Sequence, residues 1–300
     1  MGTVLEIAVV SEDAARARAA LEACFAEARA LDALVNHWQP DSALAELNRA
    51  AGGAPRFVPP GLARILADAA ALARRSEGAF DPTVGPLVAL WREAREAGRL
   101  PASERLDAAR ARVGFAGIEL DGLQARLARP GMSVDLGGFA KGWALDRLGE
   151  VLARHGIERA LLSFGQSSLL ALGAPEDAPA WRVLVRDPRG GFAGVASLRD
   201  ASLSVSESFG ESAEVAGRRL GHVIDPRSGE PLDRAAGAVV VAPSGAEAEA
   251  WSKAVLVLPA ARAFALLEAE AGVEALLLEP RRGRRSTTGF DTVVAFASLP

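Results

Sequence analysis

The chain has 300 residues, a formal net charge of −4 at pH 7 and a hydrophobic fraction of 50%. This length allows one large domain or two medium ones with an ample core, and the hydrophobic content excludes a disordered chain. The acidic balance argues against a nucleic-acid-binding protein, because such a protein needs a basic face. The single cysteine, Cys24, excludes an intramolecular disulfide and a cysteine-based metal cluster, and its neighbours predict a buried position on a helix.

The N-terminal part of the chain predicts a strand followed by helices. The strand over residues 1–10 lacks the cationic region and cleavage site of a signal peptide, and no apolar run reaches the roughly 20 residues that span a bilayer. We therefore expect a soluble, cytoplasmic protein without membrane insertion. Helical periodicity extends over residues 12–35, and a short helix follows to residue 47 with Asp41 or Ser42 as its N-cap.

The middle of the chain changes from helices to short strands. A helix opens at the two prolines 59 and 60 and runs to residue 75, and another carries Leu87, Leu90 and Trp91. From residue 117 onward, strands are punctuated by Gly, Pro and Asp, with a hairpin signal at Asp121-Gly122. The predicted strands cover residues 118–120, 125–127, 159–163, 168–172, 181–186, 194–198, 202–206, 221–224 and 239–242.

The C-terminal part predicts two helices, over residues 246–257 and 260–271, and two strands, over 274–278 and 291–297. The arginine cluster at 281–285 is expected to be a solvated loop. Many antiparallel-looking strands with helices inserted in blocks indicate an α+β protein, not a doubly wound parallel sheet. No linker composition separates two independent domains, so we expect a single domain over residues 1–300.

The most informative segment runs over residues 133–147, where a carboxylate, two glycines and a lysine surround a helix start. Gly137 and Gly138 allow close approach of a ligand, and the first helical turn offers unpaired amides beside Lys141. This combination suits a phosphate or pyrophosphate, although the glycine spacing fits neither the P-loop nor the dinucleotide pattern. The alternative is a plain helix entry that Asp135 caps, with a solvated Lys141.

Further segments pair polar residues with turn chemistry. Asp81 precedes a proline-initiated turn and is either a helix cap or a ligand for an approaching polar group. His222 and Asp225 stand at a strand end that enters a turn, a common place for catalytic residues. Glu249 and Lys253 are four residues apart at a helix start, the spacing of an ordinary surface ion pair.

In their order and spacing, these motifs resemble the ApbE family, the FAD:protein FMN transferases. The resemblance implies an α+β fold of duplicated T-fold-type antiparallel sheets with packed helices. It also implies a reaction in which FMN from the substrate FAD is attached to a Ser or Thr hydroxyl of a target flavoprotein, with release of AMP and a requirement for Mg²⁺. The segments that carry the resemblance are Met1-Gly2-Thr3, Trp38-Gln39-Pro40-Asp41-Ser42 with Leu47-Asn48, Phe80-Asp81-Pro82-Thr83-Val84-Gly85-Pro86-Leu87 with Leu90-Trp91, Asp135-Leu136-Gly137-Gly138-Phe139-Ala140-Lys141-Gly142, and His222-Val223-Ile224-Asp225-Pro226-Arg227-Ser228-Gly229.

The resemblance also assigns roles to individual residues. His222 is the general-base candidate with Asp225 as alternative or orienting partner, and the competing interpretation makes His222 a structural histidine at a turn. The metal would be held by the backbone carbonyl of Gly138 and by Glu249. The residues expected to contact FAD are Met1, Trp38, Ala79, Phe80, Asp81, Asp135, Lys141 and Val223.

The sequence departs from the family where metal chemistry is expected. Glu249 and Lys253 replace an Asp and a Thr that bind Mg²⁺; a glutamate can still bind the ion, but an ammonium has donors only. Either Lys253 neutralises the pyrophosphate in the place of the metal, or the metal site is lost and the protein binds flavin without turnover, as a carrier or regulator. Glu207 and Gln166 replace family glycines, and Glu207 would repel a nearby pyrophosphate.

Overall fold

The computed structural model describes residues 2–188, 190–210, 212–294 and 297–298. The chain divides into two compact units, each discontinuous in sequence. Unit 1 comprises Met1–Leu31, Phe139–Glu207 and Ala236–Pro300, and unit 2 comprises Asp32–Gly138 and Ser208–Ala235. The assignment of residues 1–300 to a single domain stays a prediction.

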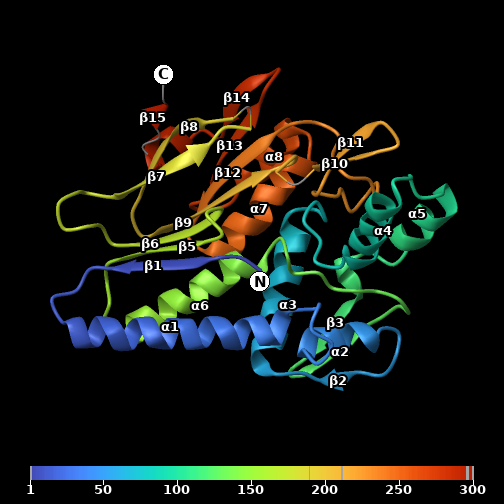
Figure 1. Ribbon diagram of the computed structural model, residues 1–300, viewed down its shortest axis with the longest axis horizontal. Helices are drawn as coiled ribbons and strands as arrows, with labels where there is room; N and C mark the ends of the chain where they lie inside the picture. Colours follow the sequence, from blue (N-terminus) through green and yellow to red (C-terminus); the bar gives the residue numbers. More distant parts are fainter. Residues whose placement is uncertain (1, 189, 211, 295–296, 299–300) are drawn as a thin grey trace. The chain divides into compact units, whose positions relative to one another are not determined.

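Unit 1 is built on a seven-stranded antiparallel sheet with the order β1-β5-β6-β9-β12-β13-β14 (Figure 1). One pattern occurs twice in this sheet: a strand is followed, after intervening helices, by a hairpin whose first strand pairs with that strand. In the first copy β1 pairs with β5 of the hairpin β5–β6, and in the second β12 pairs with β13 of the hairpin β13–β14. The predicted α+β fold with duplicated antiparallel sheets is thus confirmed. The strands are β1 (Leu5–Val9), β5 (Ala160–Phe164), β6 (Ser168–Leu172), β9 (Ala201–Glu207), β12 (Gly237–Ala242), β13 (Glu274–Glu279) and β14 (Gly283–Ser286).

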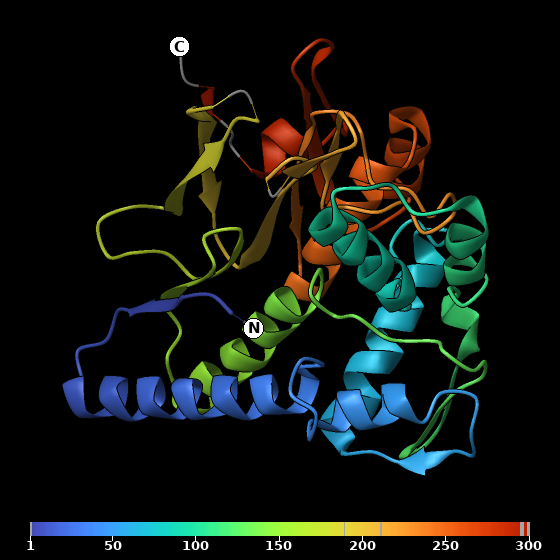
Figure 2. The ribbon, with the colours of Figure 1, turned by 45° about the vertical axis from the view of Figure 1, so that its right-hand side comes forward.

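Helices cover one face of this sheet, and a second β layer covers the other. The helices α6 (Ala140–Arg154), α7 (Gly245–Val257) and α8 (Ala260–Leu267) contact the sheet, and α1 (Ala14–Val35) reaches α6, where the Cys24 thiol faces the Leu148 carbonyl. On the opposite face, β7 (Trp181–Arg186), β8 (Phe192–Leu198) and α9 (Phe290–Val293) enclose an apolar cluster, and β15 (Ala297–Ser298) pairs with β8. Figure 2 shows the yellow β7–β8 pair on the side of the sheet away from the green α6.

The alternation of side chains along β9 produces a polar row under the helices. Leu203 and Val205 belong to the apolar cluster on the β7–β8 side, so Ser202, Ser204 and Ser206 face the helical layer. Ser204 also pairs with Ser168 on the neighbouring β6. Hydroxyl groups therefore line the helix-facing side of an otherwise apolar sheet.

The helices α6 and α7 cross in backbone contact. A Cβ at Gly142 would collide with the carbonyl of Gly245, and a Cβ at Gly245 would collide with the carbonyl of Gly142. Asp146 of α6 then accepts hydrogen bonds from the backbone amides of Gly245 at 2.6 Å and Ala246 at 2.9 Å, at the start of α7. Together these contacts fix the register of α7 against α6.

Unit 2 contains helices, a three-stranded sheet and a hairpin. Helix α4 packs on α5 and on the hairpin β10–β11, around a cluster that includes Trp91, Ala109 and Leu220. The indole of Trp91 donates to the Gly229 carbonyl at 2.7 Å. The elements are α2 (Ala43–Arg49), α3 (Pro60–Arg75), α4 (Gly85–Ala97), α5 (Ser103–Arg110), the 3₁₀ turn Phe115–Gly117, the sheet strands β2 (Arg56–Phe57), β4 (Gln124–Leu127) and β3 (Ile118–Asp121), and the hairpin β10 (Ser212–Val215) and β11 (Arg218–Gly221).

Two C-terminal predictions were wrong. The predicted strand over residues 291–297 is the helix α9 at its start, because Phe290 and Val294, four residues apart, are both buried on one helical face; residues 295–296 lie outside the described part of the chain. The predicted arginine loop belongs in part to β14, where Arg285 pairs with Glu279 and Arg284 with Asp291.

Other differences concern short elements. The predicted strand at 221–224 ends instead at Gly221, and α5, β2 and β10 were not predicted. The helix predicted over 260–271 ends at Leu267. Of the two N-cap candidates for α2, Ser42 is the cap, since its hydroxyl accepts from the Ala45 amide at 3.0 Å. Among the described residues, no helix combines the length and apolar character needed to cross a membrane.

Candidate functional site

A buried carboxylate held by two lysines forms the most strongly charged cluster of unit 1. The Lys141 ammonium, on the first turn of α6, donates to Glu249 Oε1 at 2.9 Å. The Lys253 ammonium, one turn after Glu249 on α7, pairs with Glu249 Oε2, and the Ser168 hydroxyl donates to Oε1. The alternative interpretation of Glu249 and Lys253 as an ordinary surface ion pair is therefore wrong, because Glu249 is fully buried.

The hydroxyl row of the sheet extends this cluster. Lys141 Nζ donates to Ser167 Oγ and Ser168 Oγ, each at 2.8 Å. Ser252 of α7 shares hydrogen bonds with Ser206 at 2.8 Å and Ser204 at 3.2 Å, and donates to the Glu249 carbonyl at 2.8 Å. Lys253 Nζ also lies 3.3 Å from Ser252 Oγ. Polar groups from α6, α7, β6 and β9 thus converge on one place.

The charges of this cluster do not cancel. Burial raises the pKa of Glu249, but Lys253 and Lys141 outweigh it and hold that pKa at about 2. Burial lowers the pKa of the Lys253 amine, and Glu249 only partly offsets that effect. The formal charges of two lysines and one glutamate leave one positive charge in surplus. The side chains of Lys141 and Lys253 are 20% and 18% exposed against 1% for Glu249, so the two lysines are more accessible than the acid between them.

The helix start beside Lys141 has the predicted form. The structure confirms a helix here, α6, from Ala140 onward, and Phe139 at its N-cap position offers no side-chain hydrogen bond. Asp135 does not cap the helix; its Oδ1 accepts from the Gly137 amide at 2.8 Å. The first amides of α6 and its positive dipole end therefore add to the charge of Lys141. This part of unit 1 suits an anion with oxygen acceptors.

The same residues do not fit a divalent metal ion. Both oxygens of Glu249 are engaged by ammonium and hydroxyl donors, and the Lys253 ammonium has no lone pair for a metal. No group of three or more His, Cys, Asp or Glu side chains placed to hold a metal occurs among the described residues. The role of Gly138, the other expected metal contact, stays a prediction.

Unit 2 presents an exposed aromatic surface at Trp38, whose side chain is 61% exposed. The Arg92 guanidinium lies 4.4 Å from the centre of the indole, and the His37 ring lies 4.6 Å from it. His37 Nε2 is 3.7 Å from Asp135 Oδ2. His37 therefore contacts both Trp38 and Asp135, two residues expected to bind FAD. His37 itself was not predicted from the sequence. An exposed flat ring beside a cation is suited to stacking with a planar ligand.

The segment that carries Asp135 is locked against the turn that carries Asp81. The Asn48 side chain bonds both the amide and the carbonyl of Val134, at 2.8 and 2.9 Å. The Asp135 amide donates to the Pro82 carbonyl at 2.8 Å, and Gly85 packs against Ser133 with no room for a Cβ. These contacts explain why an Asn and a Gly occupy their motif positions.

The Asp81 carboxylate organises its own turn. It accepts hydrogen bonds from the Thr83 amide and hydroxyl at 2.8 and 2.6 Å, and from the Phe115 amide at 2.9 Å. Burial raises the pKa of Asp81, and these hydrogen bonds oppose the rise. Asp81 does not cap α4, whose N-cap is Val84, and Ala79 and Phe80 are buried beside it. Their role as FAD contacts stays a prediction.

His222 and Asp225 lie where β11 enters a turn. His222 follows the last strand residue and is exposed, whereas Val223 is buried. Asp225 is bound by Arg227, whose backbone amide, Nε and Nη2 donate to the carboxylate at 2.9, 3.0 and 2.9 Å. Asp225 therefore orients Arg227, and its link to His222 stays a prediction. Met1 lies outside the described residues.

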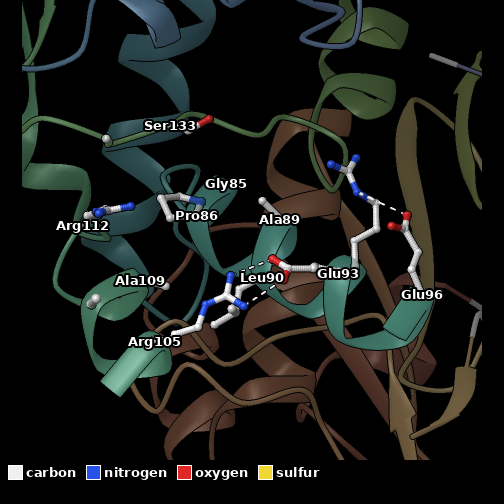
Figure 3. A pocket seen from close by; sticks show the side chains of 13 residues that line it. Gly85, Pro86, Ala89, Leu90, Glu93, Glu96, Arg105, Ala109, Arg112 and Ser133 are labelled. Carbon is white, nitrogen blue, oxygen red and sulfur yellow. Dashed lines mark hydrogen bonds and ion pairs between the residues drawn. The ribbon is translucent and has the colours of Figure 1, made fainter. Parts of the chain in front are cut away.

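A cavity of about 760 Å³ lies between α4 and α5 (Figure 3). Arg105 and Glu93 face each other in it with hydrogen bonds of 2.8 and 2.6 Å, and the Arg92 guanidinium lies 3.9 Å from Glu96. Two arginines and two glutamates of the lining are thus paired with one another. None of the predicted site residues lines this cavity, so we do not assign it to the candidate site.

Comparisons with known proteins show which family and which fold this chain resembles. The sequence model described as the ApbE family matches residues 1–277. The FAD:protein FMN transferase of Treponema pallidum is 33% identical over 96% of this chain and 85% of its own length, and that of Salmonella typhimurium is 32% identical over 90% and 80%. The crystal structure of Pseudomonas stutzeri flavinyl transferase ApbE in its apo form is 27% identical, with a TM-score of 0.86 over 100% of this chain and 95% of that chain.

Proposed function

The chain belongs to the ApbE family, and from this premise we propose that it is an FAD:protein FMN transferase. In this proposal it moves FMN from FAD to a Ser or Thr hydroxyl of a target flavoprotein and releases AMP. The observation that carries the proposal is the surplus positive charge of the Lys141–Glu249–Lys253 cluster. Such a charge supports binding of the pyrophosphate that is cleaved in this reaction.

The proposed step is a phosphoryl transfer. The acceptor hydroxyl oxygen forms a bond to the phosphorus of the FMN moiety, and the bond from that phosphorus to the bridging oxygen breaks. AMP leaves with the bridging oxygen, and the hydroxyl proton passes to a base. Such a reaction depends mainly on positioning and on charge neutralisation, which Lys141 and Lys253 would provide.

We assign the base role to His222. It is exposed at the end of a strand, and an imidazole has an ordinary pKa close to neutral pH. The Asp225 carboxylate is engaged by the Arg227 guanidinium, which favours His222 over Asp225 as the proton acceptor. In the same proposal Trp38 stacks with a ring of FAD and Asp135 and Lys141 bind its polar groups. The remaining contacts are assigned to Met1, Ala79, Phe80, Asp81 and Val223.

The family reaction uses Mg²⁺, but the donors at Glu249 and Lys253 do not fit that ion. When bound, Mg²⁺ would neutralise phosphate charge; here no step depends on it. A second candidate function is a FAD-binding carrier or regulator without turnover. It is favoured by the misfit of Mg²⁺ at Glu249 and Lys253, because a family member without its metal site would bind FAD without turning it over. Glu207, which was expected to repel the pyrophosphate, follows the alternation of Leu203 and Val205 onto the β7–β8 side of the sheet, away from the two lysines.

One experiment separates the two functions. The protein is mixed with FAD and a flavoprotein that carries the acceptor Ser or Thr, once with EDTA and once with Mg²⁺. Covalent flavin fluorescence in a denaturing gel together with released AMP is the expected result. Tight FAD binding without AMP under both conditions would establish the carrier and reject the transferase.

A further inference from the structure

The usage of lysine singles out the cluster around Glu249. Of the 34 Lys and Arg residues in the chain, only Lys141 and Lys253 are lysines. Both contact the carboxylate of Glu249, although they are far apart in sequence. The chain thus uses arginine at every other basic position and lysine at both positions around one buried acid.

Lysine and arginine are not equivalent at such a place. An ammonium is a compact point charge with three donors, whereas a guanidinium is a broad planar fork. Around Glu249 the space is confined, because α6 and α7 cross in backbone contact and the serines of β6 and β9 close the third side. A compact ammonium fits beside the carboxylate in this confined space, whereas a broad guanidinium would need more room.

The contacts of Lys253 are those of a bound cation. Its ammonium pairs with one oxygen of Glu249 and lies 3.3 Å from Ser252 Oγ, and Lys141 and Ser168 hold the other carboxylate oxygen. The carboxylate is almost fully buried, while the two ammonium-bearing side chains remain partly exposed. The buried acid therefore holds two lysines whose side chains are more accessible than its own.

We propose that the Lys253 ammonium is a resident cation that takes the place of a divalent metal ion, so that Lys141 and Lys253 bind a diphosphate without metal. The proposal rests on the proposed function only in naming that diphosphate as the pyrophosphate of FAD. A covalently attached charge is present at every metal concentration. Binding of FAD is therefore insensitive to chelators.

The first test uses the presence of just two lysines. Protein labelled with ¹³C and ¹⁵N in lysine side chains gives two side-chain amine signals, which Lys253→Arg and Lys141→Arg variants assign. In EDTA, inorganic pyrophosphate and FAD are expected to shift both signals. If FAD binds in EDTA and the Lys253 signal stays in place, the proposal is wrong.

The second test asks whether a metal ion enters the cluster. Mn²⁺ broadens the signals of nuclei close to it, so the two lysine signals report its position. In the unmodified protein we expect both signals to remain sharp when Mn²⁺ is added alone. Broadening of the Lys253 signal at equimolar Mn²⁺ would place a metal beside the lysine and overturn the proposal.

The third test measures FAD affinity with EDTA and with Mg²⁺. The unmodified protein keeps the same affinity in both. Lys253→Thr binds roughly 10-fold more weakly in EDTA and recovers with Mg²⁺, because a hydroxyl and the freed Glu249 oxygens can bind the ion. Lys253→Met is weakened in both conditions. Arg18→Thr, which removes an exposed positive charge from α1, behaves as the unmodified protein and is the matched control.

The outcomes keep the two proposals apart. If the unmodified protein does not bind FAD in EDTA, the resident-cation proposal is wrong. If AMP is released only with Mg²⁺, the resident-cation proposal is also wrong, but the transferase proposal stands. Metal-free FAD binding with a shifted Lys253 signal but no AMP contradicts the transferase and supports the resident cation. Circular dichroism of Lys253→Met and Lys253→Thr checks that both variants are folded.

Discussion

The Asp146 carboxylate of α6 accepts a hydrogen bond from the backbone amide of Gly245, the first residue of α7, with 2.6 Å between Oδ1 and N. The second carboxylate oxygen accepts from the Ala246 amide at 2.9 Å, so the side chain caps a neighbouring helix at two points. Lys141 lies on α6 and Glu249 and Lys253 lie on α7, so this cap sets the relative position of the charged groups. Asp146 is thus a positioning residue, one turn of helix away from the cluster that it aligns.

Removing this cap is expected to destabilise unit 1. Asp146→Ala leaves two helix N-terminal amides without their acceptor, a loss of about 1–2 kcal/mol in the free energy of unfolding at neutral pH. Urea unfolding followed by circular dichroism measures it. Glu150→Ala, an exposed change on the same helix, serves as control and should shift the midpoint far less. Equal effects of the two variants would contradict the cap.

The same carboxyl gives a pH dependence. Burial raises the pKa of Asp146 to about 6; the Ala246 and Gly245 amides oppose the rise, and Glu247 and Glu150 add to it. Between the ordinary value of 3.8 and about 6 the folded state binds the proton more tightly than the unfolded state. The pH-dependent part of this group's contribution to stability is therefore complete below pH 3.8 and is lost as the pH rises through about 6.

Asp146→Asn cannot ionise, so it tests that sign. The free energy of unfolding of the unmodified protein, minus that of Asp146→Asn, is expected to fall as the pH is raised from 4 to 7. Urea titrations at several pH values measure this difference. A difference that grows with pH would show that the carboxyl is stabilised in its charged form.

The glycine pair at the helix crossing is a second determinant of the geometry. Gly142→Ala or Gly245→Ala places a Cβ against a backbone carbonyl, and we expect a loss of about 2 kcal/mol or more together with weaker FAD binding. Gly149→Ala on α6 is the matched control, because its Cβ would meet the flexible end of the Leu170 side chain. Thermal unfolding and FAD titration compare the three. If Gly245→Ala changed neither the free energy of unfolding nor the FAD affinity, the two helices would be able to move apart to accommodate the Cβ.

His222 is expected to affect turnover and not binding. Removing a general base typically slows a reaction by about 10²–10⁴-fold, so His222→Ala should slow AMP release to this extent at unchanged FAD affinity. His222→Gln, which keeps a polar side chain of similar length, should be equally slow. A variant that loses FAD binding instead would support the structural histidine of the alternative interpretation.

Trp38 is expected to affect binding. Stacking on an exposed aromatic ring contributes about 1–3 kcal/mol for a nucleobase, so Trp38→Ala should weaken FAD binding by roughly 10-fold or more, and Trp38→Phe should retain part of the affinity. Quenching of flavin fluorescence measures both. Phe57→Ala, another exposed aromatic of unit 2, is the control. Identical affinities for Trp38→Ala and the unmodified protein would remove Trp38 from the site.

The sequence predicted elements whose periodicity is long and missed those that depend on tertiary contacts. Helix α6 follows from apolar residues at helical spacing such as Trp143, Leu148 and Leu152, all buried. The strand β14 is rich in arginine, and its pairing with β13 depends on partners such as Glu279. Helix α9 is a single turn fixed by burial of Phe290, a signal too short for periodicity.

The candidate site shows the same limit. Glu249 and Lys253 are neighbours along a helix and were identified as a metal ligand and a possible replacement of the metal, with an ordinary surface ion pair as the alternative. Their burial depends on Lys141, more than one hundred residues earlier, which no local pattern connects to them. The alternation of Ser202, Ser204 and Ser206 in β9 was a usable signal for a polar row facing the helices. Placing that row beneath α7 required the register of the sheet.

The pairing of β1 with β5 governs the order in which this chain can fold during synthesis. Leu5 of β1 pairs with Phe164 of β5, so β1 has no strand partner on this side until residue 164 has been synthesised. By then the segment Asp32–Gly138, the larger part of unit 2, has already been synthesised. Closing so long a loop is entropically costly and slow. The lysine–glutamate cluster, which needs α7 as well, is therefore completed late, and nascent chains stay without an anion site until synthesis is almost finished.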